Sequence, residues 1–94
     1  MLFRSPLSAG WNTVSFPREL EADALTVLQQ LIDRGSLVKV QDEKGNAIEN
    51  LGTLGGWHNA IGLFRSGEAY RICVNQPDTL TIFPTYPPSS QAQP

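Results

Sequence analysis

Few residues of this chain have the types that an active site needs. His58 is the only histidine, and catalysis through it would need a nucleophile such as Ser66 or Cys73 and a carboxylate such as Glu68. No spacing among these four residues encodes that arrangement. The sequence therefore predicts a protein that is not an enzyme, with no catalytic residue and with His58 as an exposed or loop-capping side chain.

Metal and cofactor sites are equally difficult to assemble. Cys73 is the only cysteine, which excludes an internal disulfide and argues against a thiolate zinc site. The acidic turn at 42–46 lacks the alternating acidic positions and the distal glutamate of a calcium loop. The glycine-rich segment 52–56 lacks the lysine and the following helix of a phosphate-binding loop. We therefore expect no metal and no cofactor.

Charge limits the classes of partner. The chain of 94 residues has seven Lys and Arg against nine Asp and Glu, a net charge of −2, and no basic run. Nucleic acids and anionic membranes attract clustered Lys and Arg, so neither is expected as a partner. The sequence has no signal peptide and no apolar run long enough for a membrane span. We expect synthesis in the cytosol with assembly into a particle, or an extracellular location if the chain was cut from a longer precursor.

The first half of the chain predicts one strand and one helix. Residues 7–16 alternate as a strand, with Asn12, Val14 and Phe16 on one face, and Pro17 ends it because proline has no amide hydrogen. Residues 23–34 have helical periodicity, with Asp23 as the N-cap and Gly35 as the stop. The expected apolar stripe of this helix is Ala24, Val27, Leu28, Leu31 and Ile32, and its expected water-facing side chains are Thr26, Gln29, Gln30 and Asp33.

The second half predicts two hairpins separated by a packed irregular segment. Residues 37–41 and 47–50 form the first hairpin around the turn at 42–46, with Val38 and Val40 on one face. Residues 69–74 and 79–83 form the second, with Leu80 and Ile82 pointing inward. The segment 51–67 between them is rich in glycine and is expected to close one end of the core through Leu54, Trp57, Ile61, Leu63 and Phe64.

These elements predict an α+β fold, a small, mostly antiparallel β-sheet with one amphipathic helix packed on a face. Residues 1–83 are expected to form a single domain. Residues 84–94 hold four of the seven prolines and no charge, so they cannot bury enough apolar area to fold alone. We expect an extended, Pro-, Ser- and Gln-rich tail.

Several short motifs together resemble a module repeated in large bacterial surface and secreted proteins, notably of Bacteroidetes. The resemblance covers about residues 7–83 and rests on the segments 10–17, 37–40, 54–57, 61–62, 67–70 and 79–82. The usual module opens with Gly-Trp-Asn, continues with a short helix and has a late Gly-Glu-Gly-Tyr strand, in which Ala69 replaces the second glycine here. The resemblance implies a non-catalytic spacer or attachment domain.

The expected function is therefore structural. We expect a module that docks onto protein subunits of a larger assembly, such as a phage particle or a related injection machine, and that can form a homo-oligomer. The expected contact residues are Trp57 and His58 in the glycine-rich segment and Tyr86, Pro87 and Pro88 in the tail. The alternative is an excised domain of a cell-surface or secreted protein that acts as a spacer or binds carbohydrate through its aromatic residues.

Overall fold

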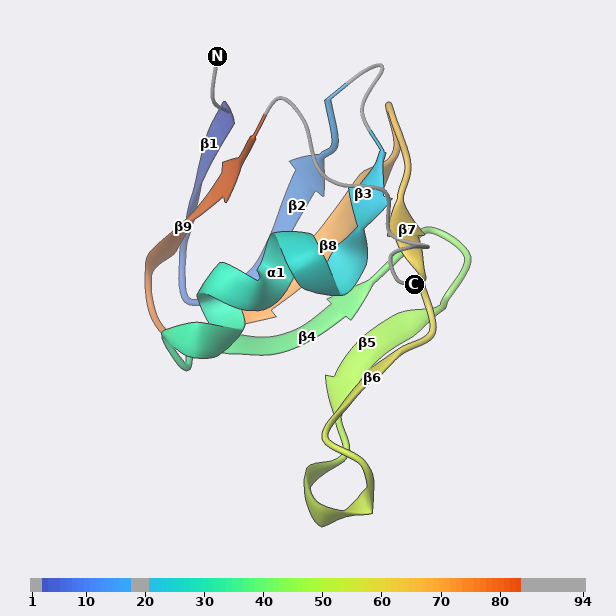
Figure 1. Ribbon diagram of the computed structural model, residues 1–94. Coiled ribbons are helices and arrows are strands. Elements are labelled where there is room, and N and C mark those ends of the chain that lie inside the picture. Colours follow the sequence, from blue (N-terminus) through green and yellow to red (C-terminus); the bar gives the residue numbers. More distant parts are fainter. Residues whose placement is uncertain (1–2, 18–20, 84–94) are drawn as a thin grey trace.

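In the part of the chain that the structure describes, one α-helix combines with strands that form one five-stranded and two two-stranded antiparallel sheets (Figure 1). The structure is a computed structural model and describes residues 3–17 and 21–83. The described elements are β1 (Phe3–Leu7), β2 (Gly10–Ser15), β3 (Ala22–Asp23), α1 (Ala24–Asp33), β4 (Leu37–Gln41), β5 (Ala47–Asn50), the 3₁₀ turn η1 (Gly52–Leu54), β6 (Trp57–Asn59), β7 (Leu63–Phe64), β8 (Ala69–Val74) and β9 (Asp78–Ile82). The predicted α+β class is confirmed.

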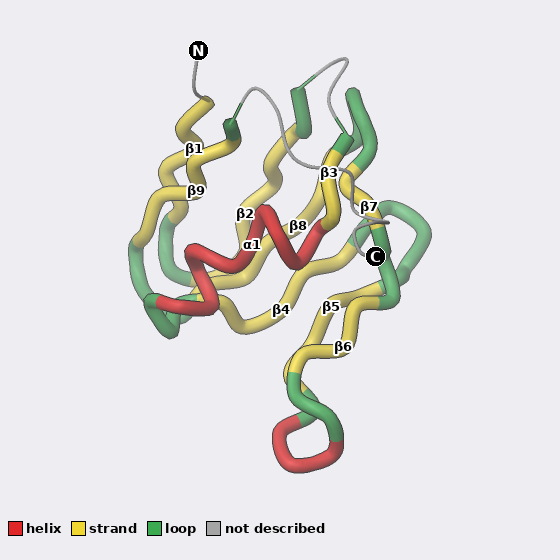
Figure 2. The backbone as a smooth tube through the Cα atoms, viewed as in Figure 1, coloured by secondary structure: helices red, strands yellow, loops and turns green. Residues whose placement is uncertain are grey.

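The main sheet has five antiparallel strands in the order β2-β8-β4-β5-β6. Two further pairs, β1 with β9 and β3 with β7, lie beside it. Helix α1 lies in front of β2 and β8, and the two-stranded pair β1–β9 lies beside its C-terminal half (Figures 1 and 2). The helix and the β1–β9 pair thus enclose the inner face of the sheet. The predicted tail at 84–94 lies outside the described residues.

Helix α1 forms where its capping residues predict it. The Asp23 carboxylate accepts a hydrogen bond from the Thr26 amide at 3.0 Å, which satisfies one of the amides that a helix start leaves unpaired. Gly35 ends the helix with φ +75°, a left-handed conformation that costs glycine little. The predicted apolar stripe is buried at Ala24, Val27, Leu28 and Leu31, with Ile32 half-buried.

The β4–β5 hairpin is confirmed, but one of its faces was predicted wrongly. Val40 is fully buried, whereas Val38 is 45% exposed. The pairing of β4 with β8 passes from Leu37 opposite Val74 directly to Lys39 opposite Cys73, so Val38 is the extra residue of a β-bulge. The bulge lets Leu37 and Val40, three residues apart, both face the core.

The predicted strand at 7–16 is interrupted: it covers β2 (Gly10–Ser15) and only the last residue of β1 (Phe3–Leu7), which was not predicted. Asn12 explains the break, because its side chain bridges the turn between them. The Asn12 Oδ1 atom accepts from the Ser8 amide at 3.0 Å, and its Nδ2 donates to the Ser8 carbonyl at 2.9 Å. In β2 the predicted alternation holds at Val14 and at the following Phe16, which are buried.

The second predicted hairpin is wrong, although both of its strands exist. Strand β8 pairs with β2 and β4, while β9 pairs with β1. Leu80 and Ile82 do point inward and are 1% exposed. Gln30, predicted to face water, is instead half-buried and holds β9: its Nε2 donates to the Thr81 carbonyl at 2.8 Å and its Oε1 accepts from the Thr81 amide at 2.9 Å.

A polar network fixes the start of β9 to the end of the helix. Asp78 accepts hydrogen bonds from the Arg34 Nε at 3.0 Å and from the Ser36 hydroxyl at 2.5 Å. Ser36 is the one fully buried polar residue of the described chain, so it depends on this partner. The Arg34 guanidinium and the Ser36 hydroxyl hold the pKa of Asp78 at about 2, below its usual 3.8.

This network predicts an acid-dependent loss of stability. A carboxyl group whose pKa is lower in the folded state stabilises the fold above its unfolded-state pKa, and the gain disappears as the pH falls through its folded-state pKa. We expect Asp78→Asn to cost about 1–2 kcal/mol near neutral pH, allowing for solvent screening, and progressively less from pH 3.8 to pH 2. Urea unfolding of both chains across this range measures the difference. An equal difference at pH 6 and pH 2 would contradict it, and Asp33→Asn is the control.

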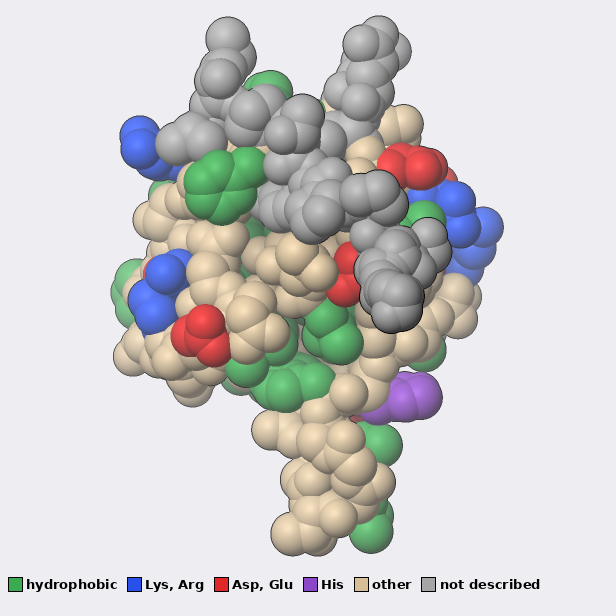
Figure 3. Space-filling view, viewed as in Figure 1, with side chains coloured by type: hydrophobic (Ala, Val, Ile, Leu, Met, Phe, Trp, Pro, Cys, Tyr) green, Lys and Arg blue, Asp and Glu red, His purple; other side chains and the backbone are tan. Residues whose placement is uncertain are grey.

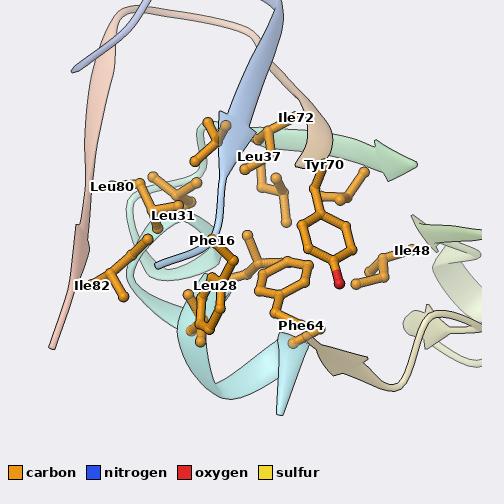
Figure 4. Packing of buried hydrophobic residues seen from close by; sticks show 14 of the residues in the cluster. Phe16, Leu28, Leu31, Leu37, Ile48, Phe64, Tyr70, Ile72, Leu80 and Ile82 are labelled. Carbon is orange, nitrogen blue, oxygen red and sulfur yellow. The ribbon is translucent and has the colours of Figure 1, made fainter. Parts of the chain in front are cut away.

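The core is a single apolar cluster between the helix and the sheet (Figure 4). Phe64 lies at its aromatic end, with ring centroids 5.6 Å from Phe16 and 4.5 Å from Tyr70. Burial raises the pKa of Tyr70, whose hydroxyl accepts a hydrogen bond from the Arg65 amide at 2.7 Å. The end of the glycine-rich segment 51–67 and the start of β8 are therefore fixed to the core.

Candidate functional site

The most prominent surface feature is an arm formed by residues 47–59, which comprise β5, η1 and β6. Its base is fixed to the core, because Ile48 is fully buried and the Ala60 amide donates to the Ala47 carbonyl at 3.0 Å. Its far end extends away from the rest of the molecule (Figures 1 and 2). The arm therefore presents a defined end to the surroundings.

The arm tip, residues 51–56, is held by its own hydrogen bonds. The Leu51 amide donates to the Gly56 carbonyl at 2.7 Å, and the Gly56 amide donates back to the Gly52 carbonyl at 2.9 Å. The Asn50 side chain accepts from the Gly52 amide at 2.8 Å. Gly52 and Gly56 have φ of +62° and +68°, which glycine adopts at little cost. The tip is thus an ordered turn without a core of its own.

Two leucines of the tip face solvent. Leu54 is 84% exposed and Leu51 is 41% exposed, and no residue from 50 to 57 is charged. Hydrophobic side chains are visible at the end of the arm in Figure 3. The expectation that Leu54 helps to close the core is wrong, because the β5–β6 hairpin carries it beyond the core. Phe64 does pack as predicted, at 1% exposure.

Trp57 and His58, both predicted contact residues, lie together on β6 beside the tip. Trp57 is half-buried and packs against the core cluster. His58 is exposed, opposite Glu49 of β5, and is visible on the side of the arm in Figure 3. These two residues therefore lie at the start of the strand that follows the arm tip. Tyr86, Pro87 and Pro88, the other predicted contact residues, lie outside the described residues.

His58 also belongs to a row of side chains on the outer face of the sheet. The register places Trp11, Cys73, Lys39, Glu49 and His58 on five neighbouring strands in that order. Lys39 and Glu49 form an ion pair at 3.7 Å, and the Arg71 guanidinium lies 5.0 Å from the Trp11 ring centroid. His58 and Cys73 are three strand spacings apart, about 14 Å, which is too far for the hydrogen bond of a catalytic pair.

The acidic turn at 42–46 uses its oxygen atoms within the turn. The Asp42 carboxylate accepts hydrogen bonds from the amides of Lys44 at 2.9 Å and Asn46 at 2.8 Å. Desolvation raises the pKa of Asp42, but these bonds and one from the Asn46 side chain together lower it below its usual value. Within residues 3–17 and 21–83, no group of three or more His, Cys, Asp or Glu residues could hold a metal ion.

Comparison of the chain with family models, curated proteins and solved structures finds no match. The resemblance to the bacterial surface module therefore stays a prediction. Among the described residues, no helix is both long and apolar enough to span a bilayer.

Sequence reasoning missed Leu51 and Leu54 as the exposed residues of the site. The signal that could have found them is the turn chemistry around them. Asn50, Gly52, Gly55 and Gly56 are turn-forming residues, and a turn so rich in glycine leaves its few side chains outside the sheet. The apolar character of Leu54 instead predicts burial, and Leu51 carries no prediction of its own.

Proposed function

We propose that this protein is a non-enzymatic assembly module that docks onto other protein subunits by inserting its arm tip into an apolar pocket. The observation that carries this proposal is the 84% exposure of Leu54 at the end of an ordered, projecting hairpin. A leucine held out on such a turn contributes little to the fold. Its exposure is compatible with a role in contact with another molecule.

Energetics support docking through this tip. Full burial of one leucine side chain stabilises a contact by about 1.5–3 kcal/mol. The hydrogen bonds of the tip reduce the entropy lost on binding, because the turn is ordered before the partner arrives. The absence of charge from 50 to 57 means that no ion has to be desolvated. Trp57 and His58, beside the tip, would form the rim of the contact.

Carbohydrate binding, the alternative function, has less support. A sugar platform needs an accessible aromatic ring face. Trp57 is half-buried against the core, and the more exposed Trp11 has Arg71 over its ring at 5.0 Å. Both rings already contact other side chains. Contact with protein subunits, such as those of a phage-like particle, agrees better with the exposed leucines.

Site-specific photo-crosslinking tests the proposed function. A photoreactive amino acid at Leu54 should crosslink to one discrete protein in the native cells, and the same amino acid at Val38, also exposed, should not. With the purified partner, Leu54→Ser should weaken binding at least about tenfold in calorimetry, while Val38→Ser should have little effect. Equal crosslinking from both positions, or unchanged affinity of the Leu54→Ser variant, would refute the docking role of the arm.

The same substitution should leave the fold intact. Leu54 makes few contacts that folding could lose, so Leu54→Ser is expected to change the free energy of unfolding by no more than about 0.5 kcal/mol. Thermal unfolding measures this directly. A large loss of stability would mean that the tip has a structural role. Weaker binding of the Leu54→Ser variant to its partner would then reflect unfolding and would contradict the docking role.

A further inference from the structure

A groove lies between the first residues of β1 and the end of β2. Its volume is about 420 Å³, within the roughly 300–1,000 Å³ of pockets that enclose small ligands. It exists because β1 and β2 belong to different sheets and do not pair. The apolar part of the wall consists of Phe3, Phe16 and Ile82. Arg4 is the only charged residue among the described residues that line the groove. Phe3 is 42% exposed there.

The groove and the arm tip lie at opposite ends of the molecule. In Figure 1 the start of β1 and the ends of β2 and β9 are at the top, whereas η1 is at the bottom. The molecule extends about 30 Å in its two longer directions. A chain therefore cannot place its ordered tip in its own groove, but a second copy can present its tip to it.

The chemistry of the two surfaces is complementary. The tip offers Leu51 and Leu54 without any charge, and the groove offers the exposed ring of Phe3 above a buried apolar floor of Phe16 and Ile82. The carbonyl oxygens of Thr53 and Leu54 accept no hydrogen bond from another described residue. Arg4 is exposed and has no ion-pair partner in the part of the chain that the structure describes. Its guanidinium can donate to such carbonyls, which satisfies groups on both sides of the contact.

We infer that the arm tip of one copy docks into this groove of a second copy, in a head-to-tail contact. The inference rests on the proposed function and names the partner of the arm. The contact is heterologous, since it joins two different surfaces, so each docked copy leaves one tip and one groove available. Such contacts produce rings or open chains instead of closed dimers. One tip in one groove gives a small interface, and association should therefore depend on concentration.

Sedimentation velocity of the full chain tests the contact through complementation. The wild-type protein should show a mass that rises with concentration above the 10.3 kDa monomer. Leu54→Ser removes the apolar side chain of the tip, and Phe3→Ser removes the exposed ring of the groove. Each variant alone should associate at least about tenfold more weakly than the wild type, and so be monomeric at concentrations where the wild type associates. An equimolar mixture should form one species of twice the monomer mass, because one intact tip and one intact groove remain. Arg4→Gln is a second groove variant with the same expected result.

A wild-type protein that stays monomeric at millimolar concentration would overturn the inference. A mixture that stays monomeric while wild type associates would also overturn it, since association would then use other surfaces. Far-UV circular dichroism should be the same for all variants. A monomeric wild type whose Leu54 crosslinks to a different protein would refute the self-contact and leave the proposed function standing.

Discussion

Phe64→Ala is expected to lower the free energy of unfolding by about 3–5 kcal/mol, the largest effect of any substitution considered. Phe64 is 1% exposed and its ring packs on those of Phe16 and Tyr70, so alanine leaves a cavity lined by two aromatic rings. It also lies on β7, whose two residues pair with β3 at the start of the helix. Urea unfolding followed by tryptophan fluorescence measures the loss.

Leu54→Ala is the matched control for this substitution. It removes a large apolar side chain from the same glycine-rich segment, but that side chain is 84% exposed. Its expected effect is within about 0.5 kcal/mol. Similar losses for Phe64→Ala and Leu54→Ala would contradict the separation of this segment into an exposed arm tip and a core strand.

Leu28→Ala is expected to cost about 2–5 kcal/mol. Leu28 is fully buried in the middle of the only described α-helix and belongs to the core cluster. A chain of this length has a total stability of about 5–14 kcal/mol, so the loss is a large part of what holds the fold together. Thermal unfolding should show a lower midpoint, and the variant can unfold at moderate temperature.

Gln29→Ala is the control next to Leu28, because Gln29 is exposed and, among the described residues, its side chain hydrogen-bonds only to Asp33, at 2.8 Å. The thermal unfolding midpoint of the Gln29→Ala variant should differ little from that of the wild type. If Leu28→Ala left the unfolding midpoint where it is, the helix would not cover the sheet, and the arrangement of the core described above would be wrong.

Local signals in the sequence were sufficient for the helix and for most inward-facing positions. Asp23 and Gly35 mark the ends of α1 because capping depends on residues within one turn of the helix. Tyr70, Ile72 and Val74 alternate into the core because strand side chains alternate with a period of two. These features need no information from distant parts of the chain.

The candidate site was only partly predictable. Trp57 and His58 were identified from their residue types, and the structure places them beside the arm tip. Leu51 and Leu54 were missed, because an apolar residue in a glycine-rich segment has the same local pattern whether the segment folds back on the core or projects from it. The length of the β5–β6 hairpin relative to the core decides between these cases, and that is a tertiary property.

The sequence by itself determined the helix, the strands β2, β4, β5, β8 and β9, and most of their buried positions, since these follow from periodicity and turn chemistry over a few residues. Only the tertiary structure decided that β9 leaves β8 to pair with β1, that Val38 forms a bulge, and that Leu54 projects into solvent. Strand partnership depends on hydrogen bonds between residues far apart in the chain. The side chains of Gln30, Arg34 and Ser36 bind β9 across more than forty residues, and no local pattern encodes that contact.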